Sequence, residues 1–334
     1  MSDNLHKVVQ QLEWLRHRYR FGEVSAFSEA GFDSGESTDM LNILRSVSVG
    51  WAKDESGQDL LSVHVQDSAY MDCHLVDWLL KATEGRIRLT YTGRVSAVSA
   101  DPPLIGPVDP LQIGYSVGHD ALGGFGTLGC FVRDGDEDAA GILSCNHVIT
   151  DQTQPPTAGR IRQPAKADHG TSGNEIAQPV KRIRLVGAGN ISDAAYARLD
   201  EGLGFSTTVP DGMRRISGNT VEPTDHMAVH KVGRTTGLTH GEIESVGRND
   251  LALLIPRFGV IGFDDIICVR STGTDWFCDG GDSGSLVVND DGDAVGLVFA
   301  AGDPHTVPRK DRLCYICRIE PILRLLNLTI VPST

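Results

Sequence analysis

Positive charge is scarce in this sequence, in which 30 Lys and Arg residues face 44 Asp and Glu residues, for a formal net charge of -14. Binding to nucleic acid or to anionic lipid depends on clustered cationic side chains, which neutralise phosphates and release their counterions. The single basic cluster, at 16–20, is short. The composition therefore argues against nucleic acid and against a membrane surface as partners.

Long hydrophobic runs are also missing. No stretch approaches the roughly 20 consecutive apolar residues that cross a bilayer, and residues 1–22 lack the uninterrupted apolar core of a signal peptide. We therefore expect a cytoplasmic protein. The seven cysteines are odd in number and lack the spacing of a small disulfide scaffold, so we expect reduced thiols. Cys314 and Cys317 have CxxC spacing, but no second ligand pair accompanies them, which favours buried structural cysteines over a zinc site.

Hydrophobic periodicity predicts a small α+β domain over residues 1–100. Apolar residues from Leu5 to Leu15 recur at helical spacing and predict an amphipathic helix over 4–20, followed by a Gly/Ser/Asp-rich loop over 31–39. The remaining elements expected in this domain are a strand hairpin, a helix and a further strand, at 44–53 with 60–66, at 71–83 and at 86–95.

A proline-rich segment, 101–111, marks the boundary that we expect between this domain and the rest of the chain. From 112 to 318 the sequence consists of short apolar runs separated by turn signals, a texture typical of sandwiches and barrels. A last helix is expected over 320–328. The predicted fold is therefore mainly β, with a small N-terminal α+β domain and a C-terminal helix.

The stretch CDGGDSGSLVV, 278–288, places Ser283 among glycines and acids ahead of an apolar strand. A nucleophilic serine needs a base to take its proton, a carboxylate to hold that base, and donors aimed at the developing oxyanion. The stretch GILSCNHVIT, 141–150, delivers His147 at the end of an apolar strand, and NISDAAYARL, 190–199, places Asp193 before another. These three residues are the candidate catalytic group.

These motifs resemble those of the chymotrypsin-like (trypsin-like) serine peptidases. The resemblance rests on SCNHVI, SDAAYARL and GGDSGSLV, in that order, and on VGRTTGLTHGEI at 232–243, which is similar to the small bacterial members. It covers about 112–328, within an expected protease-like domain over 112–334, and implies two packed six-stranded antiparallel β-barrels with the catalytic triad in the cleft between them.

By this resemblance, Ser283 is the nucleophile, His147 the general base and then acid, and Asp193 the residue that orients His147. The backbone N–H groups of Gly281 and Ser283 form the oxyanion hole. The implied activity is an intracellular serine endopeptidase that acts on a protein or peptide substrate without a cofactor or a metal ion.

The sequence departs from the family pattern around the substrate pocket. Phe277 occupies the position at the pocket base, where no acid is present, so cleavage after Arg or Lys is not supported. The segment Phe299-Ala300-Ala301 stands where the family has a serine that supports the triad aspartate, and Ala301 is a second candidate pocket residue. No cut site precedes the domain that would create a new N-terminus to pair with Asp282, so the bacterial arrangement fits better.

The sequence also offers motifs for another hydrolase class, a different cleft histidine and metal sites. An α/β-hydrolase is disfavoured because Ser285 breaks the G-x-S-x-G elbow. His119 is a rival cleft histidine, and His226 with His230 has the spacing of a zinc pair in a strand-like context. The acidic clusters at 134–138 and 289–293 lack the EF-hand pattern and are expected to be hairpin turns.

The main competing function is a catalytically inactive, protease-like binding protein. The N-terminal domain also suggests regulation, because a broadly active protease inside a cell would be harmful. We therefore expect residues 1–100 to restrain or target the enzyme, with a regulatory protein partner, through the helix at 4–20 or by covering the cleft.

Overall fold

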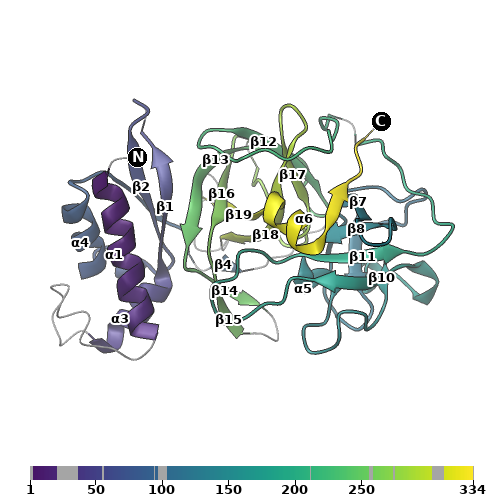
Figure 1. Ribbon diagram of the computed structural model, residues 1–334, viewed down its shortest axis with the longest axis horizontal. Helices are drawn as coiled ribbons and strands as arrows, with labels where there is room; N and C mark the ends of the chain where they lie inside the picture. Colours follow the sequence, from purple (N-terminus) through teal and green to yellow (C-terminus); the bar gives the residue numbers. More distant parts are fainter. Residues whose placement is uncertain are drawn as a thin grey trace.

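Strands dominate the architecture, as the sequence predicted (Figure 1). The computed structural model describes residues 3–20, 37–54, 56–93, 95–96, 104–210, 212–255, 259–273, 275–302 and 312–333. Three regions follow one another along the long axis in Figure 1: the N-terminal α+β unit, a closed barrel and a curled sheet. Within the described residues, no helix is both long and apolar enough to cross a membrane.

The central region is a closed antiparallel barrel. Its strand order is β12-β17-β18-β19-β16-β13, and pairing between β12 and β13 completes the ring. Alternate residues of these strands, such as Val229, Ile243 and Ile267, fill the interior. The strands are β12 (Ala228–Gly233), β13 (Gly237–Asn249), β16 (Ile266–Ser271), β17 (Leu286–Asn289), β18 (Ala294–Gly302) and β19 (Leu313–Arg318).

The region that precedes the barrel in sequence is a curled sheet ordered β20-β7-β8-β11-β10-β9-β5-β6, so the first of the two predicted barrels is a curled sheet. The C-terminal helix α6 (Ile319–Leu326) leads into β20 (Leu328–Ile330), which pairs with β7 and returns the chain end to this sheet. The other strands are β5 (Ser116–His119), β6 (Gly126–Thr127), β7 (Cys130–Asp134), β8 (Ala140–Ser144), β9 (Ile161–Arg162), β10 (Glu175–Arg182) and β11 (Ala195–Leu199).

Small elements connect these regions. Strands β14 (Leu251–Ile255) and β15 (Gly259–Phe263) pair with each other, and β4 (Val95–Ser96) pairs with β18. The helical segments of this part are α5 (Asn146–Ile149), η3 (Lys166–Asp168) and η4 (Ser172–Asn174). Both acidic clusters lie at hairpins as expected: Lys181 bridges Asp134 and Asp136 in the first, and the Asn289 side chain accepts from two turn amides in the second.

The N-terminal unit has the predicted α+β composition, with one difference. Residues 44–46, expected to begin a strand, instead end a helix, because Met40, Ile43 and Leu44 are buried at helical spacing on one face. Strands β1 and β2 form the predicted hairpin, and β3 is parallel to β2. The elements are α1 (Asp3–Arg20), α3 (Ser37–Ser46), β1 (Val47–Lys53), β2 (Asp59–Val65), η2 (Ser68–Tyr70), α4 (His74–Ala82) and β3 (Ile87–Tyr91).

The expected boundary between the two domains is crossed by hydrogen bonds. In the described part of the proline-rich segment, the Leu104 and Leu111 amides donate to Arg234 O and Gly204 O, at 3.2 Å and 3.1 Å. The Val108 amide donates to Gln163 Oε1 at 3.1 Å. Residues 104–111 are therefore packed on the protease-like region, while 101–103 lie outside the described residues.

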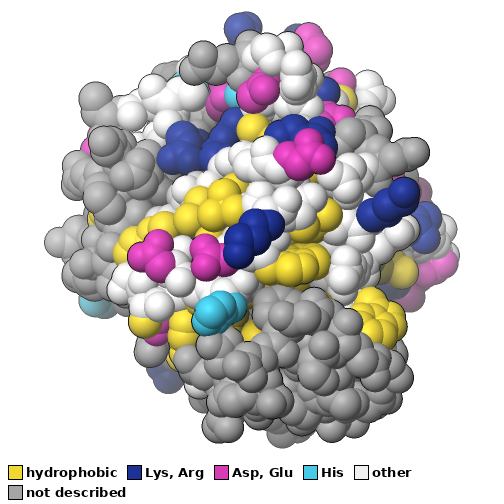
Figure 2. Space-filling view, turned by 90° about the vertical axis from the view of Figure 1, so that its left-hand side faces the viewer, with side chains coloured by type: hydrophobic (Ala, Val, Ile, Leu, Met, Phe, Trp, Pro, Cys, Tyr) yellow, Lys and Arg dark blue, Asp and Glu magenta, His cyan; other side chains and the backbone are white. Residues whose placement is uncertain are grey.

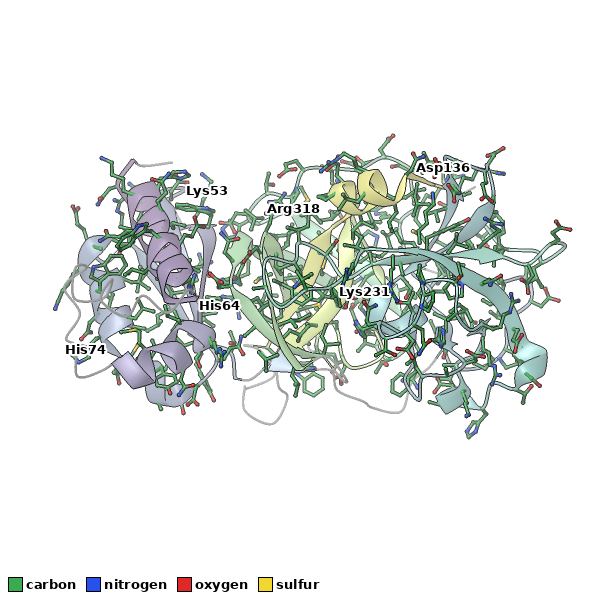
Figure 3. All side chains as sticks on the ribbon, turned by 60° about the horizontal axis from the view of Figure 1, so that its bottom comes forward. Lys53, His64, His74, Asp136, Lys231 and Arg318 are labelled. Carbon is green, nitrogen blue, oxygen red and sulfur yellow. A yellow bond between two sulfur atoms is a disulfide. The ribbon has the colours of Figure 1, made fainter. Side chains whose placement is uncertain are left out.

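The N-terminal sheet continues the sheet of the closed barrel, because β1 pairs antiparallel with the far end of β13. The period of two along β2 explains the arrangement: Leu61, Val63 and Val65 face the helices, whereas Ser62 and His64 bond to the β13 carboxylate Glu244. Figure 3 shows His64 between the N-terminal sheet and the barrel. Among the described residues, the elements from α1 to β3 therefore join the barrel edge on the side away from the curled sheet (Figure 1), whereas β4 pairs with Ala301 and Gly302 of β18.

The outer face of the N-terminal unit mixes side chains of all types. Figure 2 shows hydrophobic, basic and acidic side chains interspersed over its described residues, without a continuous field of one sign. Trp14 and Leu80 are its large exposed apolar side chains, at 42% and 38% exposure.

Arg248 joins the N-terminal strands to the barrel. It is fully buried on β13, and its guanidinium donates to Ser48 O on β1, Ser62 Oγ on β2 and Cys268 Sγ on β16, each at 3.0 Å. The charges of His64 and Arg248 hold the pKa of Glu244 well below its usual value although burial opposes this. The junction is thus a buried, charged hydrogen-bond network.

We expect Arg248→Met to lower the free energy of unfolding by about 3–5 kcal/mol, because it strands Glu244 and several polar groups in the interior. Chemical denaturation should still show one transition if the N-terminal sheet and the barrel unfold together. The control is Arg133→Met, which removes an exposed pair with Asp138 and should cost under about 1 kcal/mol. Equal effects of the two substitutions would contradict a structural role of the network.

Candidate active site

Strand pairing brings His147 and Asp193 together. β8 ends three residues before His147, β11 begins two residues after Asp193, and the two strands pair with Ala195 opposite Ser144. Asp193 is completely buried; its Oδ2 is hydrogen-bonded to His147 Nδ1, and its Oδ1 accepts from the His147 amide at 3.1 Å. Burial acts to lower the pKa of His147, but the charge of Asp193 outweighs it and raises that pKa above its usual value. The carboxylate thus fixes the ring and stabilises its protonated form.

Ser283 lies against the same region of the curled sheet. Thr127 of β6 donates its amide to Ser283 O at 2.8 Å, and a Cβ at Gly284 would lie 2.2 Å from Ser144 Oγ and 3.2 Å from the Cys145 amide. Only glycine permits this close approach, which holds the serine loop against the segment that leads to His147. The two sheets therefore supply the histidine and the serine to one place.

The hydroxyl of Ser283 is directed at β18. Its Oγ donates to Phe299 O at 3.4 Å, and within the described residues no hydrogen bond joins it to His147 Nε2. Ser283 is 7% exposed and the His147 side chain 18% exposed. The serine must therefore turn from Phe299 toward His147 before His147 can take its proton.

The backbone amides of Gly281 and Ser283 are the candidate donors of an oxyanion hole. Gly281 has φ +98, which an L side chain rarely adopts, and a Cβ there would lie 2.5 Å from Thr235 Oγ1. Within the described residues, neither the Gly281 amide nor the Ser283 amide donates to another group, whereas the Asp282 and Ser285 amides do. Backbone amides without an acceptor in the protein can donate to an oxygen that acquires negative charge.

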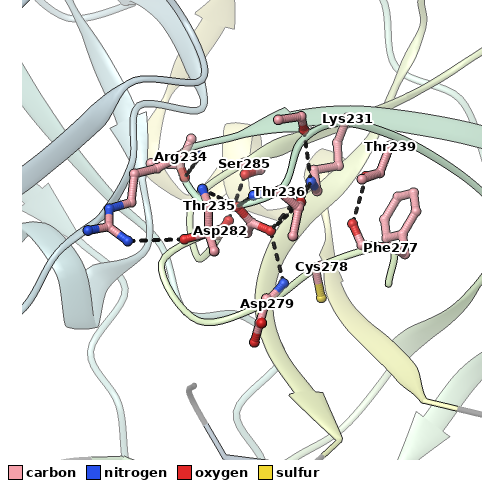
Figure 4. Close-up of polar contacts among 12 residues, drawn as sticks. Lys231, Arg234, Thr235, Thr236, Thr239, Phe277, Cys278, Asp279, Asp282 and Ser285 are labelled. Atoms are coloured by element: carbon pink, nitrogen blue, oxygen red, sulfur yellow. Dashed lines mark hydrogen bonds and ion pairs between the residues drawn. The ribbon is translucent and has the colours of Figure 1, made fainter. Parts of the chain in front are cut away.

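Asp282 anchors this loop through the contacts drawn in Figure 4. Its carboxylate is fully buried, lies 3.4 Å from Lys231 Nζ, and accepts from the Thr235 amide at 2.8 Å and the Thr236 hydroxyl at 2.7 Å. Burial lowers the pKa of Lys231, and Asp282 opposes that effect. The loop thus has an internal cationic partner from β12, in keeping with the expected arrangement that needs no new N-terminus.

Sequence reasoning missed Lys231 as a positioning residue. The only available signal was a lysine within the otherwise apolar stretch AVHKVG, where a charge is costly unless it is paired. Sequence alone gave no means of choosing Asp282 as its partner.

Arg234 ties the curled sheet to the barrel beside the serine loop. Its guanidinium pairs with Asp168, donating to Oδ2 at 2.9 Å, and stacks 3.7 Å from the ring centre of Phe125. Its amide donates to Thr127 Oγ1 at 3.0 Å, and the same Thr127 hydroxyl donates to Gly281 O at 2.8 Å. The serine loop is therefore held by hydrogen bonds from both sheets.

The cysteines differ from expectation at one pair. Cys278 and Cys314 form a disulfide with Cα atoms 5.9 Å apart, so the prediction of reduced thiols is wrong for these two. The cause is long-range: folding brings β19 beside the serine loop, which lies 36 residues away in sequence. Cys317 is three positions further along the same strand, points to the opposite face and is a free, buried thiol as predicted.

Two groups of side chains in the described residues have the composition of a metal site, but members of both groups are hydrogen-bonded to other protein groups. In the group of Cys145, His147 and Asp193, burial raises the pKa of the cysteine thiol well above its usual value and disfavours the thiolate that a metal requires. In the group of His64, Glu244 and Cys268, Arg248 donates to the sulfur. Neither favours a cation.

The two candidate pocket residues, Phe277 and Ala301, lie near the serine loop but have different surroundings. Phe277 is 1% exposed and packs in the barrel interior, 5.8 Å from Lys231 Nζ; Ala301 pairs with Cys314 between β18 and β19. Arg312, which sequence reasoning missed, bridges the loop to β18: it donates to Gly302 O at 2.5 Å and to Asp279 Oδ1 at 3.0 Å.

The rival histidines lie elsewhere. His119 is buried with Nε2 2.8 Å from Ala158 O, and His226 pairs with Glu242 at 2.7 Å. His230 Nε2 accepts from the Arg214 amide at 3.1 Å, and burial lowers its pKa to about 4, so it is neutral at pH 7. No hydrogen bond joins any of the three to Ser283 within the described residues.

We expect Lys231→Met and Asp282→Asn each to lower the free energy of unfolding by about 3–5 kcal/mol, since each leaves a buried group without its partner. The double variant should cost clearly less than the sum of the two. Thermal or urea unfolding of the four proteins measures this. Arg324→Met, which breaks an exposed pair with Glu320, is the control, and strictly additive losses would refute the coupling.

Comparisons with known proteins find partial likenesses among solved structures alone. No family model and no curated protein matches the sequence. Among solved structures, protease A of Thermobifida fusca is 16% identical with TM-score 0.47, Nocardiopsis protease 15% with 0.48, and Cellulomonas bogoriensis chymotrypsin 17% with 0.46. In each case the match covers 67% of this chain and 99% of the other. These are likenesses of fold at low sequence identity, and the case for His147, Asp193 and Ser283 as a site rests on the geometry described above.

Proposed function

We propose that this protein is a serine endopeptidase that hydrolyses peptide bonds through an acyl-enzyme intermediate. The observation that carries the proposal is the bonding of His147 to fully buried Asp193, beside a serine loop whose Gly281 and Ser283 amides have no acceptor among the described residues. A base, its orienting carboxylate, a nucleophile and an oxyanion site are the complete set of groups that acyl transfer by serine needs.

In the proposed mechanism, Ser283 Oγ attacks the carbonyl carbon of the peptide bond while His147 Nε2 takes the hydroxyl proton. The carbonyl oxygen becomes an oxyanion and accepts from the Gly281 and Ser283 amides. His147 then gives its proton to the departing amine, which leaves the acyl group on Ser283. Water, deprotonated by His147, attacks this ester, and the serine regains its proton as the acid product departs. Asp193 stabilises the imidazolium at each proton transfer.

The substrate preference follows from charge near the loop. Asp279 is the acidic side chain beside the disulfide, and it is paired with buried Arg312. A cationic substrate side chain would have to displace Arg312 from that carboxylate, so we propose that cleavage does not follow Lys or Arg. Small or modest apolar side chains remain the proposed preference.

One observation favours a second candidate function, that of a protease-shaped binding protein with an inactive triad. Ser283 Oγ is bonded to Phe299 O instead of His147. If that orientation were permanent, the nucleophile would not be activated.

Labelling with a fluorophosphonate distinguishes the two candidates. Intact-mass spectrometry should show one adduct on the native protein and none on Ser283→Ala. For peptide hydrolysis, Ser283→Ala and His147→Ala should each lower turnover by ~10⁴-fold or more, and the double variant should lose little further, because the triad acts as a unit. Folded protein that takes no label would favour the binding protein.

The rate of hydrolysis should rise with pH. Because Asp193 raises the pKa of His147, the neutral base forms only above a midpoint that lies higher than the ordinary histidine value of about 6.5. Asp193→Asn should move this midpoint to lower pH and reduce turnover by ~10⁴-fold. A pH profile of kcat/KM for both proteins tests this, and an unchanged midpoint in the variant would count against the assigned role of Asp193.

A further inference from the structure

A cavity of about 490 Å³ lies where the N-terminal helices meet the β14–β15 hairpin and the loop at 187–188. Helix α3 contacts β14, and both lie along the lower edge of the molecule in Figure 1. We propose that this cavity binds a small amphipathic carboxylate, that is, an organic anion with an apolar body. Its volume is in the range of small-molecule sites and excludes a folded partner.

The charges that line the cavity favour an anion. Arg45 is exposed and has no partner among the described residues, so its guanidinium is available to a ligand. Arg16 is 4% exposed; its Nη1 lies 3.1 Å from Asp250 Oδ2, and its Nη2 donates to Val47 O at 2.5 Å. Arg16 and Asp250 are thus engaged with each other, which leaves the Arg45 guanidinium for a ligand, and guanidinium pairs with carboxylate through parallel hydrogen bonds.

The walls favour an apolar body on that anion. Most of the remaining lining side chains are aliphatic: Leu44, Ala188, Ala252, Val260 and Ile261. Val260, which lines the cavity, is 60% exposed, and its cross-strand partner Leu254 is 57% exposed, so large apolar side chains are exposed at and beside the cavity. Such pairs are unfavourable in water and gain free energy when a ligand covers them.

The cavity also borders the segment that delivers Asp193. The Gly262 amide donates to Gly187 O at 3.0 Å, the Asn190 amide donates to Gly262 O at 3.2 Å, and the Asp264 amide donates to Asn190 O at 2.7 Å. Gly187 and Gly262 both line the cavity, and Asp193 follows Asn190 by three residues. A ligand that shifts these hydrogen-bonded segments would therefore move the carboxylate that orients His147. Occupancy of the cavity should change the reactivity of Ser283.

Binding is tested by calorimetry on full-length Ser283→Ala protein, which cannot turn over a peptide. The probes are octanoate and an acetylated trileucine with a free C-terminal carboxylate, and the neutral controls are octanol and the amidated peptide. We expect a carboxylate to bind saturably and its neutral analogue to bind with an affinity lower by about tenfold or more. Whichever carboxylate binds more tightly identifies the source as a fatty acid or a peptide end.

Variants locate the site. Arg45→Met should weaken binding about tenfold or more, whereas Arg324→Met, which removes another exposed arginine, from α6, should leave it unchanged. A peptide bound in the region of Ser283 would be insensitive to Arg45→Met. Absence of saturable binding, or equal affinities of the two arginine variants, would overturn the proposal.

Coupling is tested separately on native Ser283 protein. Saturating carboxylate should change the rate of fluorophosphonate labelling by several-fold, and Arg45→Met should remove that response at the same probe concentration. An unchanged rate in protein that binds the probe would refute the link to Asp193. The calorimetric result does not depend on catalysis, so failure of the proposed protease activity would leave it standing.

Discussion

The buried ion pair between Lys231 and Asp282 is the interaction on which the rest of the candidate site depends. Asp282 lies between the two amides proposed to hold the oxyanion, so its position fixes the path of the chain on both sides. Removing two charges from water is costly, and the pair is tolerated because Thr235 and Thr236 supply further donors. Both partners belong to the folded barrel, so the loop takes its shape without a separate activating group.

This dependence extends across the boundary between the two sheets. Thr127 receives the Arg234 amide and donates to Gly281 O, while its own amide bonds to Ser283 O. A displacement of the curled sheet would therefore move the histidine and the serine loop at once. Close contacts at Gly284 leave no room for a side chain that would keep the two apart. The site is thus a product of sheet packing, and neither sheet contains it alone.

The sequence predicted those parts of the structure that depend on a short stretch of consecutive residues. Alternation along β2, the helical period of α1 and the motifs around His147, Asp193 and Ser283 each occupy a short stretch, so they could be read directly. Features made by distant partners could not: the disulfide between Cys278 and Cys314 and the pairing of β1 with β13 depend on the finished fold. Phe277 shows the same limit, because its ring fills space left by Gly241, where a Cβ would come within 2.7 Å of it.

The position of the N-terminal unit changes what regulation by it would require. The pairing of β1 with β13 places it at the barrel edge, on the side away from the curled sheet. An influence on the site must therefore travel through contacts. Within the described residues, β4 reaches this region directly, since Val95 and Ser96 pair with Gly302 and Ala301 of β18. Two longer routes exist: along β13, which β12 and Lys231 adjoin, and through Arg16 and Asp250 to the β14–β15 hairpin, which bonds to the loop before Asp193. The second route passes through a cavity with an available guanidinium, which makes it the more readily controlled of the two.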